Sequence, residues 1–517
     1  MNLVRAITTV GGFTLLSRVF GFLRDILIAN FLGAGMIADA FFVAFRFPNL
    51  FRRLFAEGAF AAAFVPIFSG ILEQEGRDKA QEFASQAFSV LAVILAGFVI
   101  IIEMIMPWAM IVLAPGFIEV EGKMELATEL SRIAFPYLFF ISLVSLQSGV
   151  LNSINRFAAA AAAPVLLNLT LIAAILVFTD FAETSGHALA WGVAAAGVVQ
   201  FIWLVYHCRK EGFPVRFQKP VLSPKVRLLG KRILPVVFGA SLYQINLLIG
   251  TILATLVSEG AVSYLYYADR VTQLPLGVVG VAVGTALLPM LSRQLTSGQE
   301  DAAMHSQNRG LEFALLLTLP AAFALIAIPV PIVAVLFERG AFDVNATLAT
   351  AGALAAYATG LPAYVLIRVL TPGYFAREDT MTPVRIAAAS MATNIILNLI
   401  LMQYWGHIGI AYAASISAWL NALILALVLH RRGHLVIDTR LKRKSVRVLI
   451  TSAAMAIGLY VGSHALDPWL IGGEVERALG LGILIGGGLI GFAVLAQITG
   501  AASWQDLKAF RKKRDAA

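Results

Sequence analysis

Charge, cysteine and the motifs of nucleotide and metal chemistry are all scarce in this sequence. Only 13% of its 517 residues are charged, and its single cysteine, Cys208, excludes an intrachain disulfide. The seven histidines show no spacing typical of zinc ligands, so we expect no metal site. No GxxxxGK(S/T) segment occurs, so we expect no ATP-hydrolysing loop and no cofactor.

Apolar runs make up most of the chain, since 59% of its residues are hydrophobic. Runs of about 20 apolar residues are long enough to cross a bilayer as α-helices. Cutting the chain at polar, glycine and proline breaks predicts an all-α polytopic membrane protein with fourteen spans. The predicted spans are residues 8–31, 36–72, 80–113, 125–152, 158–180, 185–208, 228–257, 262–295, 305–336, 345–376, 382–404, 407–431, 445–466 and 472–499.

The distribution of lysine and arginine gives the expected orientation. With both termini in the cytoplasm, 28 of the 39 basic residues lie on that side and three, Lys123, Arg339 and Arg477, lie outside. The net charge of +9 then reflects membrane orientation, and we expect no nucleic-acid partner.

Two segments recur at a nearly constant offset. "AFVPIFS" (63–69) lies over "ALLPMLS" (286–292), and "VLLNLTLI" (165–172) lies over "IILNLILM" (395–402). Two six-helix lobes in the same membrane orientation would explain the repeat and would suit a transporter with a central cleft. The predicted organisation is an N-lobe at 1–212, a basic connector at 213–227, a C-lobe at 228–433, two extra helices at 434–500 and a basic tail at 501–517.

Several charges fall inside the first two spans and have no charged counterpart in the second copy. An arginine at mid-bilayer costs about 2.5–3.5 kcal/mol on insertion scales, so a cluster of them calls for a cavity, a partner or an anionic ligand. The guanidinium group suits phosphate or carboxylate oxygens. The candidate anion ligands are Arg18, Arg24, Arg52 and Arg270, with Asp25, Asp39, Arg53 and Asp269 as supporting charges.

Helix geometry predicts which of these charges share a face. Arg18 and Asp25 are two turns apart, and Asp39, Arg46 and Arg53 follow the same spacing, so each set should line one stripe. Salt bridges that brace the first two helices remain the alternative, above all for Arg46 and Arg53.

Asn394 and Asn398, one turn apart in the predicted eleventh span, form a further candidate site. Their side-chain oxygens could coordinate a monovalent cation, and hydrogen bonding between helices is the alternative.

Four segments carry a family resemblance. They are "SRVFGFLRD" (17–25), "FRFPNLFRRLFAEGAFAAAFVPIF" (45–68), "YYADRVTQLPLGVVGVAVGTALLPMLSR" (266–293) and "AREDTMTPVRIA" (376–387). With them the chain resembles the MurJ/MviN family of lipid II flippases, which is related to the MATE transporters of the MOP superfamily.

The resemblance implies a transporter without enzymatic activity in the bacterial inner membrane. It implies movement of lipid II, a polyprenyl-pyrophosphate disaccharide-pentapeptide, to the outer leaflet by alternating access for peptidoglycan and cell wall synthesis and cell shape. Arg18, Arg24, Arg52 and Arg270 would bind the pyrophosphate, and residues 434–500 would form a groove for the lipid tail. The expected partners are lipid II, membrane lipids and the cell wall synthesis machinery, and we expect a monomer.

The sequence leaves undecided the energy source of transport, and it leaves three alternative functions to be considered. Some relatives bind sodium through acidic residues in spans seven and eleven, where this chain offers Asn394 and Asn398, so coupling to a monovalent ion or to the membrane potential is undecided. The alternative functions are a flippase for another polyprenyl-linked glycan, a MATE-like drug exporter, and a membrane-embedded enzyme acting on polyprenyl-linked intermediates.

Overall fold

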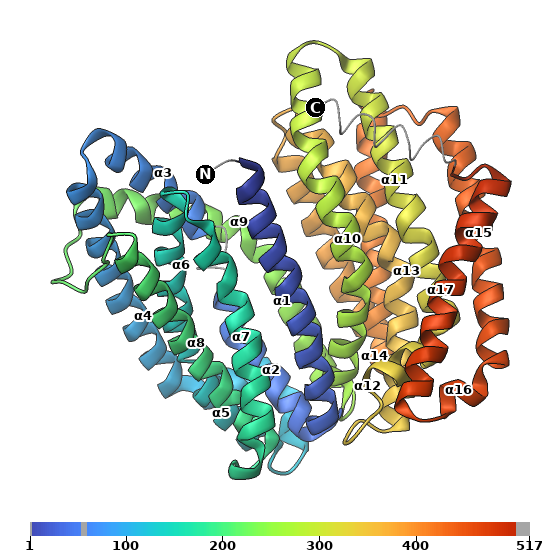
Figure 1. Ribbon diagram of the computed structural model, residues 1–517, viewed down its shortest axis with the longest axis horizontal. Helices are drawn as coiled ribbons and strands as arrows, with labels where there is room; N and C mark the ends of the chain where they lie inside the picture. The colour runs from blue at the N-terminus through green and yellow to red at the C-terminus, as the bar shows by residue number, and fades with distance from the viewer. Residues whose placement is uncertain (1–2, 53–58, 503–517) are drawn as a thin grey trace. The chain divides into compact units, whose positions relative to one another are not determined.

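Nearly all of the described backbone is helical. The computed structural model describes residues 3–52 and 59–502, with side chains for all of these except 3–7, 59, 234–243 and 278–286. No strand occurs within the described ranges, and long helices joined by short loops make up nearly all of them (Figure 1).

The helices form two compact units. Unit 1 comprises Met1–Ser263 with Arg339–Phe342, and unit 2 comprises Tyr264–Glu338 with Asp343–Ala517. Unit 1 contains α1 (Leu3–Leu32), α2 (Met36–Phe51), α3 (Ala59–Gln74), α4 (Arg77–Leu113), η2 (Pro115–Glu119), α5 (Lys123–Ala134), α6 (Tyr137–Ser153), α7 (Phe157–Val177), η3 (Thr179–Phe181), α8 (Ser185–Lys210) and α9 (Pro224–Thr255). Unit 2 takes most of α10 (Ala261–Thr296), then α11 (Glu300–Ala327), α12 (Pro329–Phe337), α13 (Val344–Phe375), α14 (Met381–Arg431), α15 (Thr439–Ala465), α16 (Asp467–Ile471) and α17 (Glu474–Thr499).

Each predicted span coincides with helix, but three of them are divided. The range 36–72 contains α2 and α3, 125–152 contains α5 and α6, and 305–336 contains α11 and α12. The two predicted spans 382–404 and 407–431 follow one another as α14, which is broken at Gly406 by a left-handed φ of 55°. Within the described residues nine helical stretches are long and apolar enough to cross a membrane, so the all-helical membrane class is confirmed and the number fourteen stays a prediction.

Phenylalanine packing forms the core of unit 1 and draws α9 into it. Phe64 stacks on Phe68 and Phe83, with ring centroids 5.5 and 5.6 Å apart. Val226 and Leu229, in the first turns of α9, are buried in the same cluster. The structure therefore divides after Ser263 and keeps α9 with the first unit, whereas the sequence repeat put residues from 228 onward in the second lobe.

The far end of α9 also packs closely within unit 1. Gly116 of η2 is buried, and its N–H donates to Thr255 Oγ1 over 3.4 Å. A Cβ at Gly116 would lie 1.9 Å from the carbonyl oxygen of Thr255. Only glycine allows these two backbones to come so close.

We expect Gly116→Ala to destabilise unit 1 by about 1–3 kcal/mol, since the added methyl group must push α9 away from η2. The thermal midpoint of the purified protein in detergent measures the change. Gly97→Ala in α4 is the control, because a Cβ there meets open space. Equal midpoints for the two variants would contradict the close approach.

Unit 2 is built around α11, α13 and α14, with α15 and α17 packed at one side. Figure 1 shows α15 beside α17, and Val448 of α15 packs with Ala496 of α17 and with Leu316 and Leu319 of α11. The outer faces of α15 and α17 expose large apolar side chains, as helices in contact with lipid do. A groove for a lipid tail at 434–500 stays a prediction.

Candidate functional site

Arg24 of α1 is buried and paired inside unit 1. Its guanidinium donates to Asp25 Oδ1 through Nη2 at 2.6 Å and Nε at 3.1 Å, and Nη1 donates to Asn168 Oδ1 of α7 at 2.9 Å. The Asn168 amide in turn donates to the carbonyl oxygen of Ser17 at 2.9 Å. The exposed fractions of Arg24 and Asp25 are 3% and 1%, so this is a buried ion pair that also joins α1 to α7.

Arg18 lies in a different environment from Asp25, although the two-turn spacing predicted a shared stripe. Arg18 is exposed, as are Leu15, Leu16 and Val19 around it, because the first half of α1 has few neighbours within unit 1. Arg18 makes no hydrogen bond or ion pair with any residue that the structure describes. The predicted stripe is therefore corrected, and the partner of Asp25 is the adjacent Arg24.

Asp39 of α2 accepts four hydrogen bonds although its side chain is fully buried. Lys123 Nζ of α5 donates to Oδ2 at 2.9 Å, and so does the N–H of Gly260 at 2.8 Å. Ser263 donates to Oδ1 from both N (3.0 Å) and Oγ (2.6 Å). Since Gly260 and Ser263 flank the start of α10, the carboxylate also caps that helix and meets the positive end of its dipole.

The ion-pair partner of Asp39, Lys123, was not predicted to lie near it. Lys123 was assigned to an outer loop, but the structure places it at the first position of α5, 2% exposed, with Nζ 4.4 Å from the ring centroid of Phe117. The charge of Asp39 is balanced by this lysine and by helix N–H groups. Asp39 is therefore part of the framework of unit 1.

We expect Lys123→Met to lower the stability of unit 1 by about 3–5 kcal/mol, because it leaves the buried Asp39 carboxylate without its cation. Unfolding of the purified protein measures the loss, and Asp39→Asn added to the same chain should restore part of it. The control is Lys79→Met, which breaks the exposed Lys79–Glu82 pair and should cause no resolvable change. A loss at Lys123 no larger than at Lys79 would contradict the framework role.

The remaining charges of α2 have partners nearby. Arg46, partly buried, donates from Nη1 to Thr251 Oγ1 of α9. Arg52, also partly buried, donates from Nε to Asn49 Oδ1 at 2.9 Å. Arg53 lies outside the described residues.

In unit 2, Arg270 and Asp269 lie side by side on α10 and are each partly buried. Arg270 donates to the Tyr266 hydroxyl at 3.2 and 3.3 Å, with its guanidinium carbon 5.2 Å from the Tyr266 ring centroid. Asp269 accepts from Gln273 Nε2 at 2.5 Å. Both contacts span one helical turn, so α10 itself orients these two side chains.

Asn394 and Asn398 contact each other within α14 and not across helices. Asn398 Nδ2 donates to Asn394 Oδ1 at 3.1 Å, and both side chains are buried. Asn398 Oδ1 has no hydrogen-bond donor among the described residues. Whether the pair binds a cation stays a prediction.

The segment "AREDTMTPVRIA" (376–387) runs from the end of α13 through a short loop into the first turns of α14. Asp379 accepts from the N–H of Thr382 at 2.9 Å and from Arg432 Nη1 at 2.6 Å. The hydrogen bonds from Thr382, and then that from Arg432, stabilise the carboxylate and lower the pKa of Asp379 to about 2. Asp379 is therefore ionised at any physiological pH.

Asn168 and Lys123 are the functional neighbours that sequence reasoning missed. Asn168 lies in the repeated segment 165–172, and a polar residue in an apolar repeat was the available signal. Lys123 gave no signal, because a lysine between two apolar runs is typical of a loop.

The arginines of α1 differ in whether a carboxylate already neutralises the guanidinium. Arg24 is neutralised by Asp25, whereas Arg18 on the same helix is exposed. An exposed guanidinium can meet an anionic ligand without first leaving a carboxylate.

Comparison with solved structures defines the class. The fold resembles "Lipid II flippase MurJ, inward closed conformation" with a TM-score of 0.79 and 25% identity, covering 96% of this chain and 99% of that one. It also resembles an inward-facing multidrug resistance MATE family transporter of the MOP superfamily, with a TM-score of 0.68 and 17% identity over 80% and 94% of the two chains. The chain therefore has the fold of the multi-pass membrane transporters of this superfamily.

Sequence comparison identifies the family within that class. The family profile described as "Lipid II flippase MurJ" matches residues 28–480. A probable lipid II flippase MurJ of Rhizobium tropici is 45% identical over 94% of this chain and 92% of its own length, and the lipid II flippase MurJ of Burkholderia cenocepacia is 39% identical over 84% and 85%. The chain belongs to the MurJ family of lipid II flippases. The predicted family and the transporter class are confirmed.

Proposed function

We propose that this chain moves lipid II from the inner to the outer leaflet of the bacterial cytoplasmic membrane for cell wall synthesis. The family match over residues 28–480 is the observation that carries the proposal. The chemistry agrees with it, because a transporter of a pyrophosphate-linked lipid needs cationic side chains at membrane depth, and this chain has them in helices α1, α2 and α10. The flippase for another glycan, the drug exporter and the enzyme have no comparable support.

In this proposal the arginines bind the pyrophosphate, and alternating access moves it. Arg18, Arg52 and Arg270 are the proposed ligands, because paired hydrogen bonds from a guanidinium suit phosphate oxygens. Arg24 can take part only if a phosphate replaces Asp25 or Asn168 as its partner. Asp25 then holds Arg24 in place before the substrate arrives.

We expect Arg18→Ala, Arg52→Ala and Arg270→Ala each to reduce lipid II exposure at the outer face when the variant is the sole copy in a depletion strain. Membrane levels of the three variants, measured beside the wild type, separate a loss of transport from a loss of folding. Arg293→Ala, at an exposed arginine near the end of α10, is the control. Normal lipid II exposure in all three variants would defeat the site assignment.

Depletion of the protein itself tests the function. Outer-face lipid II should fall on depletion and recover when the wild-type gene is restored, and unchanged exposure would overturn the proposal. Incubation of the purified protein with lipid II separates transport from chemistry, since an altered product would indicate the membrane-embedded enzyme.

We further propose that both termini lie in the cytoplasm. In a Cys208→Ser background, Asp180→Cys should react with a membrane-impermeant maleimide in intact cells stripped of their outer barrier. Ser297→Cys should react only after the membrane is permeabilised. Both positions are exposed, so accessibility depends on the side of the membrane. The reverse pattern of labelling would show the opposite orientation.

Energy coupling and partners complete the proposal. Transport of lipid II requires no cofactor in this proposal. Its energy comes from the membrane potential, worth about 2.3 kcal/mol per charge per 100 mV, or from a monovalent ion bound at Asn394 and Asn398. The chain acts as a monomer beside the enzymes that use lipid II.

A further inference from the structure

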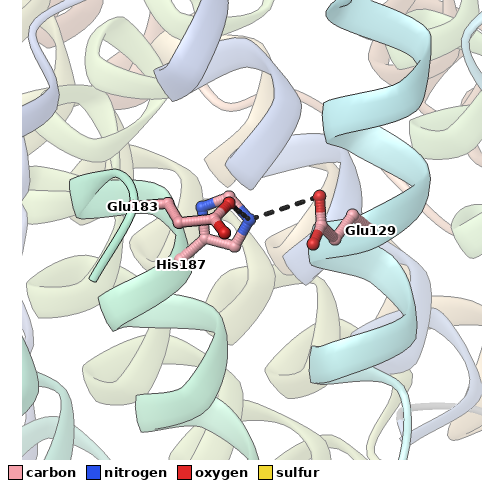
Figure 2. Close-up of side chains that lie close together, drawn as sticks. All are labelled: Glu129, Glu183 and His187. Atoms are coloured by element: carbon pink, nitrogen blue, oxygen red, sulfur yellow. Dashed lines mark ion pairs between the residues drawn. The ribbon is translucent and has the colours of Figure 1, made fainter.

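Three potential metal ligands meet in unit 1. His187 lies in the first turn of α8, Glu183 comes one turn before it, and Glu129 lies on α5 (Figure 2). His187 Nε2 is 3.5 Å from Glu129 Oε2 and 3.8 Å from Glu183 Oε2. One donor atom from each residue lies within 4.8 Å of the other two.

The imidazole of His187 is buried and points its free nitrogen at the two carboxylates. Its exposed fraction is 6%, and Nδ1 lies 2.9 Å from Thr184 Oγ1. Nε2 has no hydrogen-bond partner among the described residues, and Figure 2 shows it directed between Glu129 and Glu183. When Nδ1–H donates to Thr184 Oγ1, the Nε2 lone pair faces two groups that can only accept; in the other tautomer Nε2–H faces them and can donate.

A cation between these three atoms would remove that conflict. Two carboxylate oxygens and a neutral imidazole nitrogen repel one another when nothing lies between them, and each is a ligand for a divalent metal. A metal-binding histidine usually donates its other ring N–H to an oxygen acceptor, which fixes the tautomer and the ring orientation. The Thr184 hydroxyl oxygen, 2.9 Å from Nδ1, can accept such a hydrogen bond.

We propose that Glu129, Glu183 and His187 bind a divalent transition-metal ion such as Zn²⁺, with water as a fourth ligand. Metal–ligand bonds of about 2.0–2.2 Å in a tetrahedron separate the ligand atoms by roughly 3.3–3.5 Å. The two distances from Nε2 already approach this spacing. The glutamate side chains are 57% and 81% exposed, so they are free to close the remaining gap.

Helix packing keeps the ligands close together before any metal binds. Gly186 is buried between α2 and α5, and a Cβ there would lie 3.1 Å from Leu130 Cδ1, next to Glu129 in the chain, and 3.0 Å from Ile37 Cγ2. The start of α8 therefore lies against α5. The metal would join these two helices at their ends, so its effect would be on the stability of unit 1.

Calorimetric titration of the metal-free protein in detergent with Zn²⁺ tests the site. We expect one equivalent of Zn²⁺ to bind to the wild type. His187→Gln and Glu183→Gln should each weaken zinc binding at least about tenfold, because even the loss of a residue that only supports a metal ligand weakens binding by that factor. Glu125→Gln is the matched control, since Glu125 is exposed on α5 one turn before Glu129. Its affinity should equal that of the wild type.

Two further measurements guard against a variant that fails to fold. The thermal midpoint should rise with zinc for the wild type and for Glu125→Gln but not for Glu183→Gln, whose exposed side chain is not needed for folding. Anomalous scattering at the zinc edge should place the ion between Glu129, Glu183 and His187. Equal zinc affinity of the wild type and all the variants would overturn the proposal. So would the absence of binding at millimolar zinc, which would indicate that a proton on His187 Nε2 bridges to the glutamates in place of a metal.

Discussion

A charge buried among apolar helices needs a partner, and this constraint organises unit 1. Asp39 meets it with a lysine from α5 and with N–H groups at the start of α10, so one carboxylate fixes three segments at once. Arg24 meets it with Asp25 and with Asn168, which fixes α1 against α7. An ion pair that loses one member leaves an uncompensated buried charge, so these contacts make the arrangement of the helices specific.

The same constraint separates framework charges from charges that can serve a ligand. Arg24 is neutralised within its own helix, whereas Arg18 is exposed and makes no contact of this kind with the described residues. The two arginines occupy one helix, so α1 carries both a guanidinium held inside unit 1 and one that is exposed.

Much of the fold, but little of the site's pairing, could be predicted from the sequence. Apolar runs located the helices to within a few residues, because burial in lipid dictates their length. The partners that come from other helices could not be found, since periodicity relates only residues on one helix. Lys123 is 84 residues from Asp39, and Asn168 is 144 residues from Arg24. For the same reason histidine spacing gave no sign of His187 with Glu129, and the repeat did not reveal that α9 packs with unit 1.

Asn168 and Asn398 occupy equivalent positions of the internal repeat, yet they have different neighbours. The first reaches across to α1, and the second bonds one turn away within α14 and keeps an oxygen without a donor among the described residues. A substitution at Asn168 removes a hydrogen-bond partner of the buried Arg24, whereas a substitution at Asn398 leaves that ion pair untouched. The same amide at matching places in two similar segments therefore carries a contact between helices in one case and a contact within a helix in the other.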